Sequence, residues 1–233
     1  MESANTLHPR AVGRLVGWSL IGTIVIGIVA ARFVAPDINI NLSADVAAVA
    51  ESMLGAEQRL RARAYLLALT FGVEALISVG FFFLLRRSGP ILAGWSLFVG
   101  LAASLLMLLG AVFALNAAEF AGDAAYGAMS EEIRLMLASV QATSDYTSFH
   151  LGLILSSLAK AGFFALFLRS NLIPKIIAGW GLFASLFVAV TIVARDFIPV
   201  LGHGTITTAF MLSNLIALVS TGLYLGIRGV RTG

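Results

Sequence analysis

Two fully charged side chains stand deep within long apolar runs of this chain, and they are its first candidates for chemistry. Glu74 precedes Arg86 by twelve residues, and Lys160 precedes Arg169 by nine. Arg86 and Arg169 mark the ends of the two apolar runs. At a helical rise of about 1.5 Å per residue, Glu74 lies roughly 18 Å and Lys160 roughly 13 Å from these ends. An isolated charge at such depth is costly, so each must be paired, protonated or beside water. We expect a contact between Glu74 and Lys160.

Two interpretations of this pair stay open. The functional interpretation is a proton or ion relay, or the floor of a polar cavity. The structural interpretation is an ion pair that locks two helices together. A binding cavity must be wet, whereas a structural ion pair must be dry and mutually satisfied.

A polar stripe continues from Lys160 along the same apolar run. Its members are Tyr146, His150, Ser157 and Lys160. Asn214 adds an amide deep in the last apolar run. Residues at this spacing share roughly one helical face, so the stripe predicts the wall of a wet cavity that opens to the outer side. For His150 the alternative is a hydrogen-bonded anchor at the membrane interface.

Metal and redox chemistry have little basis in this sequence. The chain has no cysteine, and no two of His8, His150 and His203 share a helix at the i, i+4 spacing of a ligand pair. It also has no phosphate-binding glycine loop, serine nucleophile elbow or zinc-protease motif. We therefore predict no metal, no cofactor and no catalytic residue.

The composition of the chain indicates that most of its residues lie in lipid. Hydrophobic residues make up 59% of the 233, charged residues only 12%, and the mean hydropathy is +0.97. Hydrocarbon leaves no partner for an open backbone, so the spanning segments must be helices. The sequence predicts an all-α polytopic membrane protein with six transmembrane helices at about 15–35, 64–85, 91–116, 146–168, 175–195 and 206–227. They form one domain, 15–228, between tails at 1–14 and 229–233.

Charge asymmetry orients these helices. The N-terminus, two short loops and the C-terminus carry eight lysines and arginines against one acid, and the opposite loops carry six arginines against ten acids. Basic residues in short loops favour the cytoplasmic side, so both termini are predicted to be cytoplasmic. The basic residues are scattered at helix ends, which argues against a nucleic-acid partner and leaves the lipid bilayer as the predicted one. Trp18, Trp95 and Trp180 are predicted to anchor the helices at the interface.

The tryptophans also mark an internal pattern. Each follows a glycine at the start of the first, third or fifth run. The pattern predicts three related two-helix hairpins around an axis along the membrane normal. The alternative is that tryptophan marks the interface in each case independently.

The two long outer loops each contain apolar residues at helical spacing. In the first, Ser43 is the expected N-cap of a short helix over 46–53. In the second, Ser130 precedes an apolar stripe over 133–140. Both are predicted to be short amphipathic helices that lie on the outer membrane surface or cap the bundle. In the last run, Gly222 and Gly226 predict close packing against another helix of the same chain in preference to a dimer.

Several stretches resemble the bacterial multi-pass membrane proteins grouped as domain of unknown function 4386. They are Phe149-His150-Leu151-Gly152, Arg169-Ser170 with Ile173-Pro174-Lys175 and Gly179, and Gly222-Leu223-Tyr224 through Arg228-Gly229. The family pattern has an acidic residue about twelve positions before the arginine that ends the second span, where Glu74 stands. The chain departs from it at Tyr224, where tryptophan is frequent, and around His150, so the resemblance transfers no role to His150. It implies a six-helix bundle in the bacterial inner membrane and no activity.

Three functions follow in order of support. The first is a small-solute or lipid binding or permeation unit, with a polar cleft lined by Glu74, Lys160, Ser157 and His150. The second is a non-catalytic structural or regulatory membrane partner whose charged pair only stabilises the fold. The third is an intramembrane enzyme, which would need several titratable groups converging on one point. The sequence indicates neither the ligand nor the oligomeric state.

Overall fold

The computed structural model describes residues 8–122, 126 and 128–231. Within these residues the chain is helical and has no β-strand. The long helices are α1 (Pro9–Val29), extended by the π-helical segment η1 (Ala30–Val34), α3 (Glu57–Leu85), α4 (Pro90–Ala121), α6 (Glu131–Ser170), α7 (Lys175–Arg195) and α8 (Gly204–Arg228). The short elements are α2 (Val46–Met53) and the 3-10 helix η2 (Pro199–Gly202).

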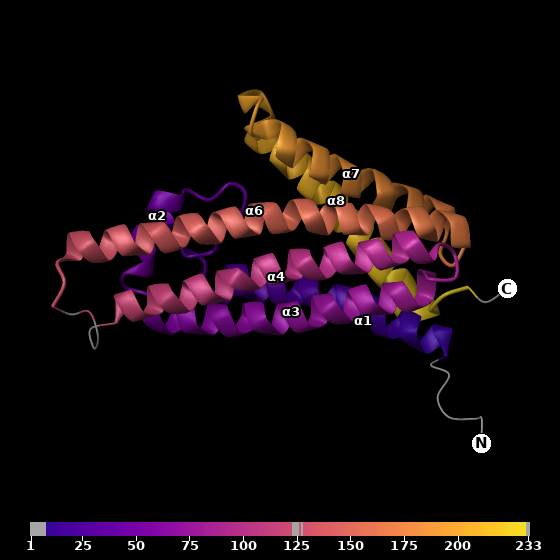
Figure 1. Cartoon of the computed structure of the whole chain (residues 1–233), viewed down its shortest axis with the longest axis horizontal. Helices are drawn as coiled ribbons and strands as arrows, with labels where there is room; N and C mark the ends of the chain where they lie inside the picture. The colour runs from indigo at the N-terminus through magenta and orange to yellow at the C-terminus, as the bar shows by residue number, and fades with distance from the viewer. Residues whose placement is uncertain (1–7, 123–125, 127, 232–233) are drawn as a thin grey trace, which may run out of the picture. The chain divides into compact units, whose positions relative to one another are not determined.

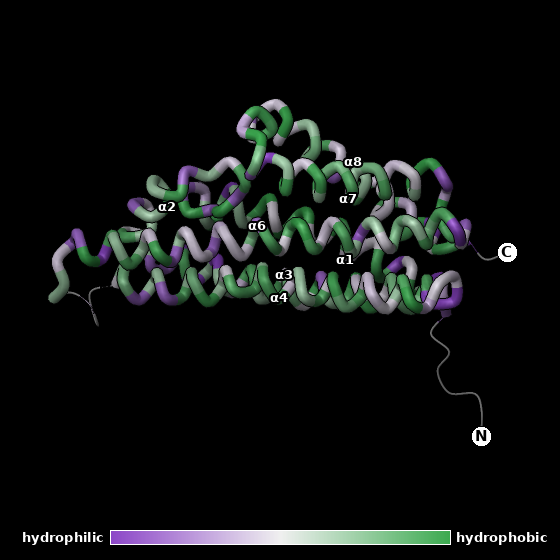
Figure 2. Tube along the Cα trace, turned by 45° about the horizontal axis from the view of Figure 1, so that its top comes forward, coloured by the Kyte–Doolittle hydropathy of each residue, from purple (hydrophilic) through white to green (hydrophobic). Residues whose placement is uncertain are grey.

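Six of the described helices are long and apolar enough to cross a membrane, and each overlaps one of the six predicted spans. Figure 2 shows hydrophobic residues along most of the length of these helices, with hydrophilic residues gathered toward their ends. This pattern is the one that a bilayer requires of a spanning helix. The predicted fold class, an all-α protein with six membrane-spanning helices, is confirmed.

One element of the prediction is wrong. The apolar stripe over 133–140 is not a separate amphipathic helix, because it belongs to α6, a single helix of 40 residues (Figure 1). No glycine or proline interrupts the chain between Glu131 and Leu151, so nothing in the backbone ends the helix there. At about 1.5 Å per residue α6 is about 60 Å long, roughly twice the thickness of bilayer hydrocarbon.

The other outer helix is confirmed at 46–53, but its cap is Asp45 instead of Ser43. The Asp45 carboxylate accepts hydrogen bonds from the amides of Ala47 at 3.1 Å and Ala48 at 3.3 Å. Ser43 instead donates its own amide to the Asn41 side chain at 2.8 Å, within the preceding turn. An aspartate cap accepts hydrogen bonds from amides that the first helical turn leaves unsatisfied, and its negative charge interacts favourably with the positive end of the helix dipole.

The chain divides into two compact units. The first unit comprises residues up to Thr23, Val73–Leu101 and the chain from Ile154 on, and the second comprises Ile24–Gly72 and Ala102–Leu153. Four long helices contribute to both units: α1, α3, α4 and α6.

The first unit is packed around phenylalanines. The Phe81 ring of α3 lies 5.3 Å from both the Phe163 and the Phe167 ring of α6. In the same unit α7 and α8 lie side by side (Figure 1), and the Trp180 indole donates to the Ser213 carbonyl across them at 3.1 Å.

The first unit also contains the predicted glycine contact. A Cβ atom on Gly17 of α1 would lie 2.7 Å from the Gly222 carbonyl oxygen, and closer still to the Gly226 amide. The two helix backbones therefore touch, and only glycine fits between them. The predicted packing of Gly222 and Gly226 within one chain is confirmed.

The second unit has an alanine-rich core. Small side chains of α3, α4 and α6 let these helices approach closely, and α2 buries Val49, Ala50 and Met53 in the same cluster. The loop before α2 buries Ile38 and Ile40 there as well. The first outer segment thus packs into this unit's core, which is the capping alternative of the prediction.

Candidate functional site

Glu74 and Lys160 both lie in the first unit, and both are half-buried. Neither side chain makes a hydrogen bond or an ion pair with another described residue. The contact expected between them is therefore not formed, although both stand inside helices that are apolar enough to span a membrane. A charge inside a membrane span is costly without a partner, so helix packing alone does not explain why this unit contains these two residues.

The helix register of the first unit nevertheless brings their levels together. Phe81 of α3 packs between Phe163 and Phe167 of α6, so position 81 is level with about position 165. Further out, a Cβ atom on Gly100 of α4 would lie 3.1 Å from the Ser78 hydroxyl and 3.5 Å from the Ala159 side chain. Ser78 precedes Phe81 in α3, and Ala159 precedes Phe163 and Phe167 in α6. Both helices therefore pass the two contact levels in the same chain direction, so they run parallel.

From these two anchors the levels of the charges follow. Position 74 of α3 is level with about positions 155–158 of α6. Lys160 lies only two to five residues beyond that level, toward the C-terminal end of α6. At about 1.5 Å per residue the offset along the helices is about 3–8 Å. Side chains on a helix point toward its N-terminus, so the long Lys160 stem extends toward the level of Glu74.

The remaining predicted site residues are divided between the two units. Ser157 is buried and Asn214 half-buried in the first unit, with Glu74 and Lys160. Tyr146 and His150 belong to the second unit, where their ring centroids lie 6.0 Å apart. The first four predicted site residues therefore lie in one unit, and the other two contact each other in the second unit. The predicted anchors Trp18, Trp95 and Trp180 are all exposed at the surface of the first unit.

The second unit contains a buried ion pair that sequence reasoning missed. Arg63 Nη1 of α3 lies 2.7 Å from Asp145 Oδ2 of α6, with the two side chains 6% and 3% exposed. The two atoms are not aligned as a hydrogen bond, and neither finds another hydrogen-bond partner among the described residues. Gly110 of α4 closes over the pair, because a Cβ atom there would lie 2.6 Å from Asp145 Oδ1.

A signal for this pair does exist in the sequence. Arg63 precedes Arg86 by 23 residues and Asp145 precedes Arg169 by 24, so the two charges have nearly equal depth on parallel helices. Matching the depth of opposite charges from a common edge would have paired them. Both residues lie just outside the predicted spans 64–85 and 146–168, where charges are normally solvated.

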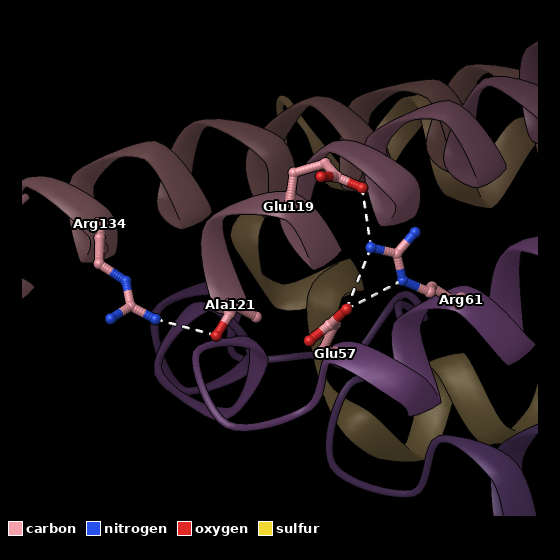
Figure 3. Close-up of polar contacts among 5 residues, drawn as sticks. All are labelled: Glu57, Arg61, Glu119, Ala121 and Arg134. Carbon is pink, nitrogen blue, oxygen red and sulfur yellow. Dashed lines mark hydrogen bonds and ion pairs between the residues drawn. The ribbon is translucent and has the colours of Figure 1, made fainter. Parts of the chain in front are cut away.

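A second set of charges lies on the surface of the second unit. Arg61 Nη2 sits 3.1 Å from Glu57 and 2.8 Å from Glu119, and so bridges α3 to α4 (Figure 3). Nearby, the Arg134 guanidinium of α6 donates to the carbonyl oxygens of Phe120 at 2.8 Å and Ala121 at 2.9 Å. It thereby satisfies acceptors that the end of α4 leaves open, where a positive charge is favourable. These contacts hold the helix ends in place.

No group of three or more histidines, aspartates or glutamates that could hold a metal ion occurs in the described part of the chain. No curated protein and no solved structure matches the chain. Residues 15–229 match the family model described as domain of unknown function DUF4386. This match covers nearly the whole chain, including the six long apolar helices apart from the first turns of α1, and the two charges within them. The chain therefore belongs to the DUF4386 family of multi-pass helical membrane proteins.

Proposed function

We propose that this protein is a small-solute or lipid binding or permeation unit whose intramembrane site is built on Glu74 and Lys160. The proposal includes a bacterial inner-membrane location with both termini in the cytoplasm, which the basic short loops support. Ser157, three residues before Lys160 on α6, and Asn214 of α8 are further polar groups of the same unit.

One observation carries the proposal: two opposite charges lie at neighbouring levels inside spanning helices, and neither has a partner among the described residues. A structural ion pair would be closed, as Arg63 and Asp145 are in the second unit. Leaving a charge unpaired in hydrocarbon costs several kcal/mol, so water, an ion or a bound molecule must supply the missing contacts. A site that keeps such groups open is typical of binding and transport.

A different observation favours the second function, a structural or regulatory membrane partner. Ile133, Met136 and Val140 form an exposed apolar stripe on α6. The stripe lies beyond the level where Asn116 of α4 contacts Gln141 at 3.4 Å, and where the exposed face of α4 becomes polar. An apolar stripe beyond the lipid-facing surface is typical of a protein contact.

Water access at the two charges separates these functions. The chain has no cysteine, so Glu74→Cys and Lys160→Cys each place one thiol at a known position. The thiols are labelled with a charged, membrane-impermeant methanethiosulfonate in proteoliposomes. The matched control is Leu76→Cys, two residues from Glu74 on an exposed apolar face of the same helix.

If the site is wet, both test thiols react at least about tenfold faster than the control, because only a hydrated thiol ionises readily. Equal, slow labelling at all three positions would mean a dry site. That result would contradict the binding or permeation proposal and leave the structural partner as the better function.

A further inference from the structure

The two charges of the proposed site differ in sign and are too far apart to satisfy each other, and this combination specifies a ligand. We propose that the site takes a zwitterion, with a primary ammonium group against Glu74 and a carboxylate or phosphate group against Lys160. The inference rests on the proposed function, because it assumes that the site is open to a ligand.

Spacing supports this class of ligand. The levels of the two residues differ by about 3–8 Å along the helices, and the axes of packed helices are separated by about 8–10 Å. The carboxylate and ammonium groups do not approach within the 4.0 Å of an ion pair. A molecule that carries both charges a few bonds apart bridges such a gap, and each protein charge then gains a charge-assisted hydrogen bond.

Charge balance favours a zwitterion over a simple ion. A lone cation at Glu74 would leave Lys160 uncompensated, and a lone anion at Lys160 would do the same to Glu74. An uncompensated charge in a low-dielectric site is the expensive state. A zwitterion has no net charge of its own and compensates both residues at once.

The same chemistry has two sources. A free amino acid offers an ammonium and a carboxylate, and an aminophospholipid headgroup offers an ammonium and a phosphate. Radiolabelled glycine, 4-aminobutyrate and 6-aminohexanoate test the first source by equilibrium dialysis against the purified full-length protein. Nanodiscs of phosphatidylethanolamine or phosphatidylglycerol, followed by native mass spectrometry, test the second.

We expect wild-type protein to bind at least one amino acid or to retain phosphatidylethanolamine selectively. Butyrate and butylamine, which each carry one of the two charges, should compete about ten- to hundredfold more weakly than 4-aminobutyrate, because each loses one charge-assisted contact. Glu74→Gln and Lys160→Gln should each lose a similar factor. The exchange variant Glu74→Lys with Lys160→Glu should recover binding with the ligand reversed, and Leu76→Gln should change nothing.

The inference is overturned if butyrate or butylamine binds as well as the matching zwitterion, or if no zwitterionic probe binds although the cysteine labelling shows a wet site. In both cases the proposed binding or permeation function stands and only the ligand class is wrong. A dry site in the cysteine experiment removes both proposals, so the two failures are distinguishable. If the exchange variant does not fold, the two single glutamine variants still decide the outcome.

Discussion

Replacing Arg63 by methionine should destabilise the protein far more than any exposed charge change does. The guanidinium is only 6% exposed and contacts a carboxylate that is 3% exposed, so its removal leaves Asp145 buried and without compensation. Breaking a buried pair in this way costs about 3–5 kcal/mol in the free energy of unfolding. Reversible denaturant unfolding of the purified protein in detergent, followed by circular dichroism, measures this loss.

Arg61→Met is the matched control. Arg61 is on the same helix and also bridges two helices through carboxylates, but its side chain is 40% exposed. Solvent screens such a contact, so its loss should destabilise the protein much less than the loss of Arg63 does. Equal losses for the Arg63 and Arg61 variants would refute the reasoning that burial makes the first pair expensive to break.

A double variant tests the same reasoning from the other direction. Arg63→Met with Asp145→Leu removes both charges, so no uncompensated group is left. Well-packed apolar replacements of a buried pair are about neutral, or stabilise by about 1–4 kcal/mol. The double variant should therefore recover most of the stability that the single variant loses, and a double variant as unstable as Arg63→Met would contradict the account.

Two further predictions concern packing and capping. Gly17→Ala should destabilise the protein by about 1–3 kcal/mol in the same unfolding assay. The added methyl group meets the Gly226 backbone, which cannot move aside as a side chain can. The control Gly22→Ala on the same helix meets nothing within 4 Å and should be neutral or slightly stabilising. Asp45→Ala should cost about 0.5–2 kcal/mol and expose the short helix α2 to faster amide hydrogen exchange, because two amides lose their acceptor, whereas Ser43→Ala should leave that exchange unchanged. Equal losses within either pair would count against the contacts described here.

The sequence by itself determined the helices and their depth. Each long apolar run must be a helix because hydrocarbon offers the backbone no other partner, and the constant rise of a helix sets how far Glu74 lies from Arg86. The short helix at 46–53 was also readable, since its apolar residues recur at helical spacing.

Only the tertiary structure decided which helices touch and which charges meet. Apolar runs look alike to one another, so nothing in them states that Gly17 packs on Gly226 or that Arg63 finds Asp145. The same holds for Glu74 and Lys160, whose depths suggested a contact that the structure does not form. A position along a helix is a local property of the chain, whereas a contact depends on the rotation and register of two helices together.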